Sequence, residues 1–184
     1  MKRYLYIDQL GSSGYIQQPV NRIISLVPSQ TELLFDLGLR EQVVGITKFC
    51  VHPAGWLREK VRIGGTKKFD MDVIDQLLPD LIIGNKEENY QEGIEQLKLK
   101  YPVWMSDIAN LPQALQMITQ VGQLVDRYTE SLSIAQRIET QFSQLPSFQY
   151  KKVLYQIWRK PWMAAGPDTF IHDMLERLGL VNVV

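Results

Sequence analysis

The chain has 184 residues, and its hydrophobic fraction of 45% is enough for a sizeable core in one large domain or two small lobes. Twenty Lys and Arg residues balance twenty Asp and Glu residues, which disfavours a nucleic-acid-binding protein because such proteins normally carry a basic face. The single cysteine, Cys50, excludes an internal disulfide and a multi-cysteine zinc site. Residues 1–15 contain no long apolar core, so no secretory signal is visible, and no run approaches transmembrane length.

The first 110 residues alternate between strand-like and helix-like segments. A strand is expected at 3–7, before a Gly-Ser-Ser-Gly turn at 11–14. Further strands are predicted at 22–27, 42–47, 60–65, 80–84 and 101–106, and helices at 30–39, 70–79 and 90–100. Strands and helices that alternate at this spacing imply a mostly parallel sheet with helices on its faces.

The pattern changes between residues 111 and 145, where no strand is predicted. Apolar residues follow one another there at spacings of three and four, which is typical of one face of a helix. One interpretation is a single helix of roughly 45–50 Å that connects two lobes as a rigid strut. The other is a pair of helices with a kink near Gly122.

An α/β pattern resumes after Pro146. A strand is predicted at 151–158, a loop at 159–166 and a helix at 167–180, with Asp168 as its N-cap. One strand and one helix do not make a lobe, so we expect a second lobe that is incomplete at Val184.

Hydroxyl and amide groups gather where the strand at 22–27 meets the following helix. Ser29 and Glu32 have the spacing of a capping box, which predicts that Ser29 caps the helix. The same junction lies at the carboxyl end of a parallel strand, where open α/β sheets bind ligands, and free amides at a helix start can hold a polar ligand group. A nucleophilic serine is disfavoured because no Gly-x-Ser-x-Gly motif is present.

Phe49 follows the strand at 42–47 and is expected to face a cleft. Together with His52 and Trp56 it would form an amphipathic loop surface, with Cys50 packed beneath. A metal site is disfavoured, because His52 and His172 are the only histidines and zinc usually needs three or four ligands.

Three further segments allow both a structural and a functional interpretation. Residues 64–68 contain two glycines without the spacing of a phosphate-binding loop, so they are predicted to be a flexible turn. The charged run 85–89 is either a solvated loop or a docking patch. Trp158 and Trp162 flank a cationic turn and are either core residues or a platform for a large planar ligand.

Three segments together resemble ABC-importer substrate-binding proteins of the helical-backbone class, which bind cobalamin, ferric siderophores, haem or bare metal ions. They are RIISLVPSQTELLFDLGLREQVVGIT, RIGGTKKFDMDVIDQLLPDLIIGN and PWMAAGPDTFIHDMLERLGLVNVV. The ordered set is specific, although each segment alone is weak. The resemblance covers the chain from Asn21 onward, and the cobalamin-binding branch is the most similar.

The resemblance implies an α/β fold with two Rossmann-like lobes joined by one long helix and a ligand held between the lobes. The corresponding parts are an N-terminal extension (1–20), a first lobe (21–107), a linking helix (108–147) and the start of a second lobe (148–184). It also implies an acidic contact with the permease, which corresponds here to Glu92, with Glu88 as a neighbour.

The match to the cobalamin branch differs from position to position. Phe49 takes the place of an aromatic residue after the second strand, whereas Phe69 and Asn85 stand near positions where that branch has tryptophan. The expected ligand-binding residues are Pro28, Ser29, Gln30, Phe49, Gly65, Thr66, Asn85, Trp158 and Trp162.

The resulting hypothesis is a non-catalytic, periplasmic or membrane-surface binding protein for a bulky metal chelate such as cobalamin. The chelate would be transported, and no permanent cofactor or metal, and no nucleic acid, is expected. A ferric siderophore or haem remains an alternative ligand, and a cytoplasmic ligand sensor remains an alternative function. An enzyme is disfavoured because nucleophile-elbow, P-loop and dinucleotide-binding motifs are missing from the sequence.

Overall fold

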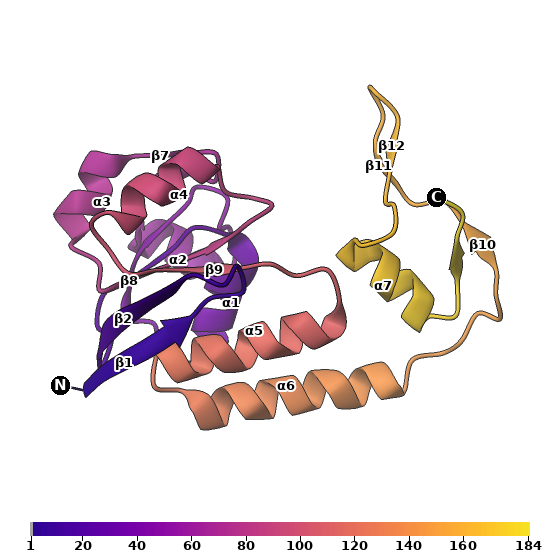
Figure 1. The fold of residues 1–184 in the computed structure, drawn as a ribbon, viewed down its shortest axis with the longest axis horizontal. Helices are drawn as coiled ribbons and strands as arrows, with labels where there is room; N and C mark the ends of the chain where they lie inside the picture. The colour runs from indigo at the N-terminus through magenta and orange to yellow at the C-terminus, as the bar shows by residue number, and fades with distance from the viewer. Residues whose placement is uncertain (1) are drawn as a thin grey trace. The chain divides into compact units, whose positions relative to one another are not determined.

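The computed structural model describes residues 2–184, which form two compact units (Figure 1). The first unit contains the residues up to Asp107 together with Gln120–Ser131, and the second contains Ile108–Thr119 together with Leu132–Val184. Among residues 2–184, no helix is both long enough and apolar enough to cross a bilayer.

The first unit is built on a five-stranded parallel sheet with the order β5-β4-β3-β8-β9. Strands β3, β8 and β9 are short, mainly apolar runs that are buried except at Asn85, as expected when both faces of a parallel sheet are covered. The strand bounds are β3 Ile23–Ser25, β4 Val43–Ile46, β5 Val61–Arg62, β8 Leu81–Asn85 and β9 Val103–Ser106. The prediction of an α/β fold with a parallel sheet is confirmed.

Four helices follow the strands of this sheet, namely α1 (Pro28–Asp36), α2 (Ala54–Glu59), α3 (Met71–Leu77) and α4 (Gln91–Lys98). Helix α3 begins where the Asp70 carboxylate accepts a hydrogen bond from the Val73 amide at 3.2 Å. It buries Ile74, and α4 buries Ile94 and Leu97, in one cluster with the sheet. These buried residues are among the apolar positions, at helical spacing, from which helices were predicted at 70–79 and 90–100.

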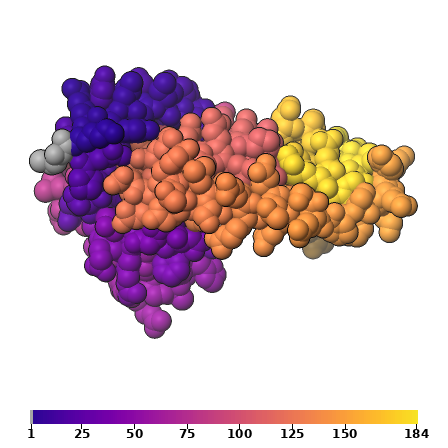
Figure 2. All heavy atoms as spheres, turned by 90° about the horizontal axis from the view of Figure 1, so that it is seen from below, coloured from indigo at the N-terminus to yellow at the C-terminus, as the bar shows by residue number. Residues whose placement is uncertain are grey.

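A hairpin of β1 (Lys2–Ile7) and β2 (Ser13–Gln18) precedes the sheet. The Tyr6 hydroxyl donates to the Val103 carbonyl at 3.2 Å, and the Gln9 amide donates to the Met105 carbonyl at 3.1 Å. Both acceptors lie on β9, so the hairpin packs within the first unit and forms part of its outer surface (Figure 2). The strand expected at 3–7 is confirmed.

The predicted cap of α1 is wrong. The helix begins at Pro28, its N-cap is Val27, and no side chain accepts a capping hydrogen bond. Proline is suited to the first helical position because its fixed φ fits the helix and an amide hydrogen there would have no partner within the helix. Ser29 therefore lies two positions after the N-cap, and its spacing to Glu32 does not form a capping box.

The span 111–145 is helical, but it is not one helix. It contains α5 (Leu111–Leu124) and α6 (Tyr128–Ser143), separated by a turn in which Asp126 has a φ of +57°. The prediction of one long linking helix is therefore wrong for this span, and the alternative of two helices holds, with the break three residues after Gly122. An ideal Cβ on Gly122 would lie only 2.1 Å from the Ser131 hydroxyl oxygen. Glycine at this position therefore allows the start of α6 to pack closely against α5.

The second unit contains a parallel pair, β10 (Lys152–Val153) and β13 (Val181–Asn182), and an antiparallel pair, β11 (Gln156–Trp158) and β12 (Met163–Ala164). Helix α7 (Phe170–Arg177) is N-capped by Thr169, whose hydroxyl accepts from the His172 amide at 3.2 Å. The prediction of Asp168 as the cap is wrong, because Asp168 lies in the turn before it with a φ of +62°.

Candidate functional site

Several predicted site residues lie at the carboxyl end of the parallel sheet in the first unit. Pro28 follows β3, Phe49 follows β4, and Asn85 ends β8. Because neighbouring parallel strands end at the same edge, the fold brings these three segments to one side of the sheet. This is the edge at which open α/β sheets bind ligands.

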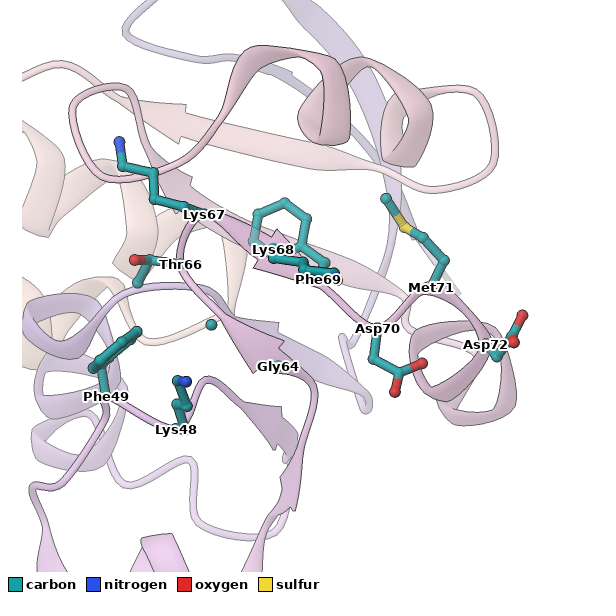
Figure 3. Close-up of a pocket in the computed structure, with 11 residues that line it drawn as sticks. Lys48, Phe49, Gly64, Thr66, Lys67, Lys68, Phe69, Asp70, Met71 and Asp72 are labelled. Carbon is teal, nitrogen blue, oxygen red and sulfur yellow. The ribbon is translucent and has the colours of Figure 1, made fainter.

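A cavity of about 720 Å³ opens beside this edge (Figure 3). It is lined by Lys48 and Phe49, by a short hairpin of β6 (Gly64–Gly65) and β7 (Lys68–Phe69), and by the first residues of α3. Gly64 has a φ of +98°, and an ideal Cβ on it would lie 2.5 Å from the Lys68 carbonyl oxygen. Only glycine fits at this position, so Gly64 closes the hairpin, and the segment that was predicted to be a flexible turn is a pair of short strands.

Phe49 and Phe69 both line the cavity, but their surroundings differ. The Phe49 side chain is 50% exposed, whereas Phe69 is 6% exposed and packs on Tyr90 with ring centroids 4.9 Å apart. An ideal Cβ on Gly65 would lie 3.2 Å from the Phe49 ring, so the ring rests against hairpin backbone. Phe49 is thus a fixed aromatic surface open to a ligand, and Phe69 belongs to the core.

A buried amide network lies below the same edge. Gln30 donates from Nε2 to the Gly84 carbonyl at 3.0 Å and to the Ser106 hydroxyl at 2.7 Å, and its own Oε1 is buried without a partner. Asn85 donates to the Ser106 hydroxyl at 3.1 Å. Ser29 is exposed and Pro28 is partly exposed. Pro28 and Ser29 are therefore accessible to a ligand, whereas Gln30 is buried and supports this edge of the sheet from below.

The charged run 85–89 is an ordered loop. The Asn85 Oδ1 accepts from the amides of Glu87 and Glu88 at 2.9 and 3.2 Å, which is a turn closed by an asparagine side chain. Asn89 donates to the Thr66 carbonyl at 3.1 Å and joins the loop to the cavity hairpin. All polar atoms of Asn85 are engaged in this scaffold, which favours an organising role for it.

The segment after β4 corrects another prediction. Cys50 is fully buried, as expected, and its thiol lies 3.1 Å from the Thr31 hydroxyl and 3.2 Å from the Thr47 hydroxyl. Trp56 does not join an amphipathic loop surface, because it lies on α2, is buried, and meets Phe35 edge-on at 5.5 Å. Within residues 2–184, no group of three or more His, Cys, Asp or Glu side chains is placed to hold a metal.

The second unit carries the two other aromatic candidates. Trp158 ends β11 and Trp162 directly precedes β12, and both side chains are exposed. The Trp158 indole donates to the Lys160 carbonyl at 3.0 Å, and the Arg159 guanidinium lies 6.0 Å from the Trp162 ring centroid. Neither tryptophan is a core residue of this unit, so both are open to a ligand.

Sequence reasoning missed the lysines of the cavity and the residues that support it. Lys48, Lys67 and Lys68 line the cavity, and Ser106 and Asn89 hold its floor and its loop. Lys48 and Ser106 could have been found, because each lies at the end of a predicted strand. Lys67 and Lys68 required knowledge of the hairpin.

Comparisons with known proteins agree with this architecture. A family model for periplasmic binding proteins matches residues 23–184. The Vitamin B12-binding protein of Vibrio parahaemolyticus is 25% identical over 187 residues, which cover 97% of this chain and 67% of that protein. The chain spans between 61% and 67% of the length of the first curated relatives it matches.

Solved structures show the same fold. A possible iron-binding (periplasmic solute-binding) protein from Staphylococcus epidermidis is 26% identical with a TM-score of 0.78, over 90% of this chain and 67% of that one. A siderophore binding protein bound to acinetobactin and ferric iron superposes with a TM-score of 0.84 over 100% of this chain and 68% of that one. At 14% identity, the latter likeness concerns the fold alone.

Proposed function

This chain belongs to the periplasmic binding protein family, and we propose that it is the substrate-binding component of an ABC importer for a bulky metal chelate. The observation that carries the proposal is the cavity of about 720 Å³ at the carboxyl edge of the sheet, with half-exposed Phe49 on its wall. A cavity of this size can take a large part of a chelate, and an aromatic face suits its apolar surface.

We propose ligand contacts on each unit, taken by itself. In the first unit they are the Phe49 ring, the exposed groups at Pro28 and Ser29, and the hairpin backbone around Gly65 and Thr66. Gln30 and Asn85 position these groups from below. In the second unit the proposed contacts are the exposed rings of Trp158 and Trp162.

Cobalamin is the ligand suggested by the Vibrio relative, which is described as a Vitamin B12-binding protein. An iron chelate is the second candidate, because the Staphylococcus structure is described as possibly iron-binding and is equally similar. In both cases the chelate is cargo, and the protein acts by binding and release without catalysis. We propose a periplasmic or membrane-surface location, by analogy with the family.

The permease contact we propose is Glu92, with Glu88 nearby. Glu92 is exposed in the first turn of α4, and Glu88 is exposed in the loop that precedes it. An exposed charge of this kind affects the rate of association and its salt dependence more than folding. Unchanged permease binding by Glu92→Gln at low salt would exclude the assignment.

The test of the proposed function is a visible-absorbance titration of the full-length protein with cyanocobalamin, haemin and a ferric siderophore. Binding moves the absorption band of a chelate that enters an aromatic site, and we expect saturation by one of the three at micromolar concentration. No spectral change with any of them, confirmed by calorimetry, would contradict the proposal.

A further inference from the structure

Three lysines surround the cavity, and none of them has an acidic partner. Lys48, Lys67 and Lys68 line it, and all three are exposed. The ion pairs found among residues 2–184 involve other cations. An ammonium without a carboxylate beside a cavity is available to bind an anion.

The charges of the cavity are separated in space. Lys48 and Lys67 lie beside Phe49 and Thr66 at one end, whereas Asp70 and Asp72 lie at the opposite end, where α3 begins (Figure 3). The Asp70 carboxylate is also engaged, because its Oδ1 accepts from the α3 backbone. The end of the cavity with the open aromatic ring is therefore its cationic end.

Both lysines at this end are held in place. The Lys48 ammonium lies 5.2 Å from the centroid of the Phe49 ring, within the range of a cation–π contact. The Lys67 ammonium donates to the Glu87 carbonyl at 2.7 Å, which uses one of its three donors. The site therefore combines the aromatic wall of Phe49 with two positioned cations.

We infer that the ligand is an anionic chelate, whose carboxylate or catecholate oxygens bind Lys48 and Lys67 while an apolar ring packs on Phe49. The inference rests on the proposed function, because it concerns the same ligand in the same cavity. An uncharged chelate would cover these ammonium groups without replacing their water, which costs binding free energy. An anion replaces that water with charge-assisted hydrogen bonds.

The test compares two ferric chelates that differ in charge, with cyanocobalamin as a third ligand. Tryptophan fluorescence of the full-length protein is titrated with a polyanionic ferric tris-catecholate, an uncharged ferric trihydroxamate and cyanocobalamin. The double variant K48Q/K67Q should bind the tris-catecholate roughly 10- to 100-fold more weakly than wild type. The matched control is Lys86→Gln, since Lys86 pairs with Asp107 outside this cavity, and it should retain wild-type affinity. Melting curves verify that each variant is folded.

The possible outcomes distinguish the inference of an anionic ligand from the proposed function as a chelate-binding protein. Tight tris-catecholate binding that K48Q/K67Q weakens and Lys86→Gln does not supports the inference. Equal binding by K48Q/K67Q, or a preference for the trihydroxamate or for cyanocobalamin, overturns the inference and leaves the proposed function standing. Failure of every chelate to bind the folded wild-type protein overturns both.

Discussion

The four tryptophans divide evenly between the two units and have opposite environments. Trp56 and Trp104 in the first unit are 1% and 0% exposed, whereas Trp158 and Trp162 in the second are 63% and 66% exposed. The first pair packs around a five-stranded sheet, and the second lies at the end of a two-stranded ribbon, which has no core of its own to bury both faces. The same residue type is thus a stabilising element in one unit and a candidate ligand contact in the other.

The comparison is tested most strongly by removing one tryptophan from each unit. Trp104→Ala should lower the free energy of unfolding by about 3–5 kcal/mol, because it leaves a large cavity beside β9. Trp162→Ala should change it by less than about 0.5 kcal/mol, as is usual for an exposed side chain. Urea-induced unfolding measures both, and equal losses would refute the division of roles.

Ligand affinity should show the reverse order. Trp162→Ala should weaken binding of the chelate by roughly 10- to 150-fold, since burial of one large aromatic ring contributes about 1.5–3 kcal/mol. The measurement is a fluorescence or absorbance titration with the ligand that the wild-type protein binds. A Trp162→Ala protein that melts at a lower temperature but binds with unchanged affinity would make Trp162 a structural residue.

A smaller difference in stability is expected between two polar residues at helix starts, of which one caps its helix and the other does not. Asp70→Ala should destabilise the first unit by about 1 kcal/mol, because Asp70 caps α3. Ser29→Ala, also at a helix start, should cost less than about 0.5 kcal/mol because it caps nothing. The same urea titrations compare the two, and a larger loss for Ser29→Ala would restore the capping role that the sequence suggested.

The smallest expected effect is a pH dependence that belongs to the first unit. Hydrogen bonds from Lys100 and Tyr101 lower the pKa of Asp75, while burial and the hydrogen bond to Asp75 raise the pKa of Tyr101 to about 12. The Asp75 contribution to stability is therefore present above the unfolded pKa of about 4 and is lost as the pH falls through the lower, folded value. The Tyr101 contribution is present below pH 10 and is lost towards about pH 12.

Unfolding curves at several pH values can measure this dependence. In Tyr101→Phe the alkaline loss of stability should be reduced, and in Asp75→Asn the acid loss should be reduced. If both variants kept the wild-type dependence of unfolding free energy on pH, the Asp75–Tyr101 pair would be excluded as its source.

The sequence predicted the sheet well because its strands are short apolar runs bounded by turn residues. The strands around Ile24, Ile82 and Trp104 lie where the pattern places them. The break between α5 and α6 was misplaced, because the apolar stripe continues through it and does not record the backbone turn at Asp126. Pro28 decided the start of α1, although the more familiar Ser-x-x-Glu spacing predicted a start two residues later.

The candidate site was predictable only in outline. Phe49 and Ser106 follow strand ends and lie at the expected edge of the sheet. The cavity itself depends on the turn at Gly64 and on the link between Asn89 and Thr66, which joins segments 23 residues apart. No periodicity in the sequence reports such a contact, so Lys67 and Lys68 on the hairpin could not be assigned in advance, whereas Lys48 directly follows a predicted strand.

The most direct test of the account compares two phenylalanines that line the same cavity. Phe49→Ala should weaken chelate binding by at least about tenfold and leave the melting temperature unchanged, because the ring is half-exposed. Phe69→Ala should lower stability by about 3–5 kcal/mol, because its ring is packed in the core. Affinity and melting temperature are measured on both variants of the full-length protein. Unchanged affinity in a fully folded Phe49→Ala protein would contradict the claim that this cavity binds the transported ligand.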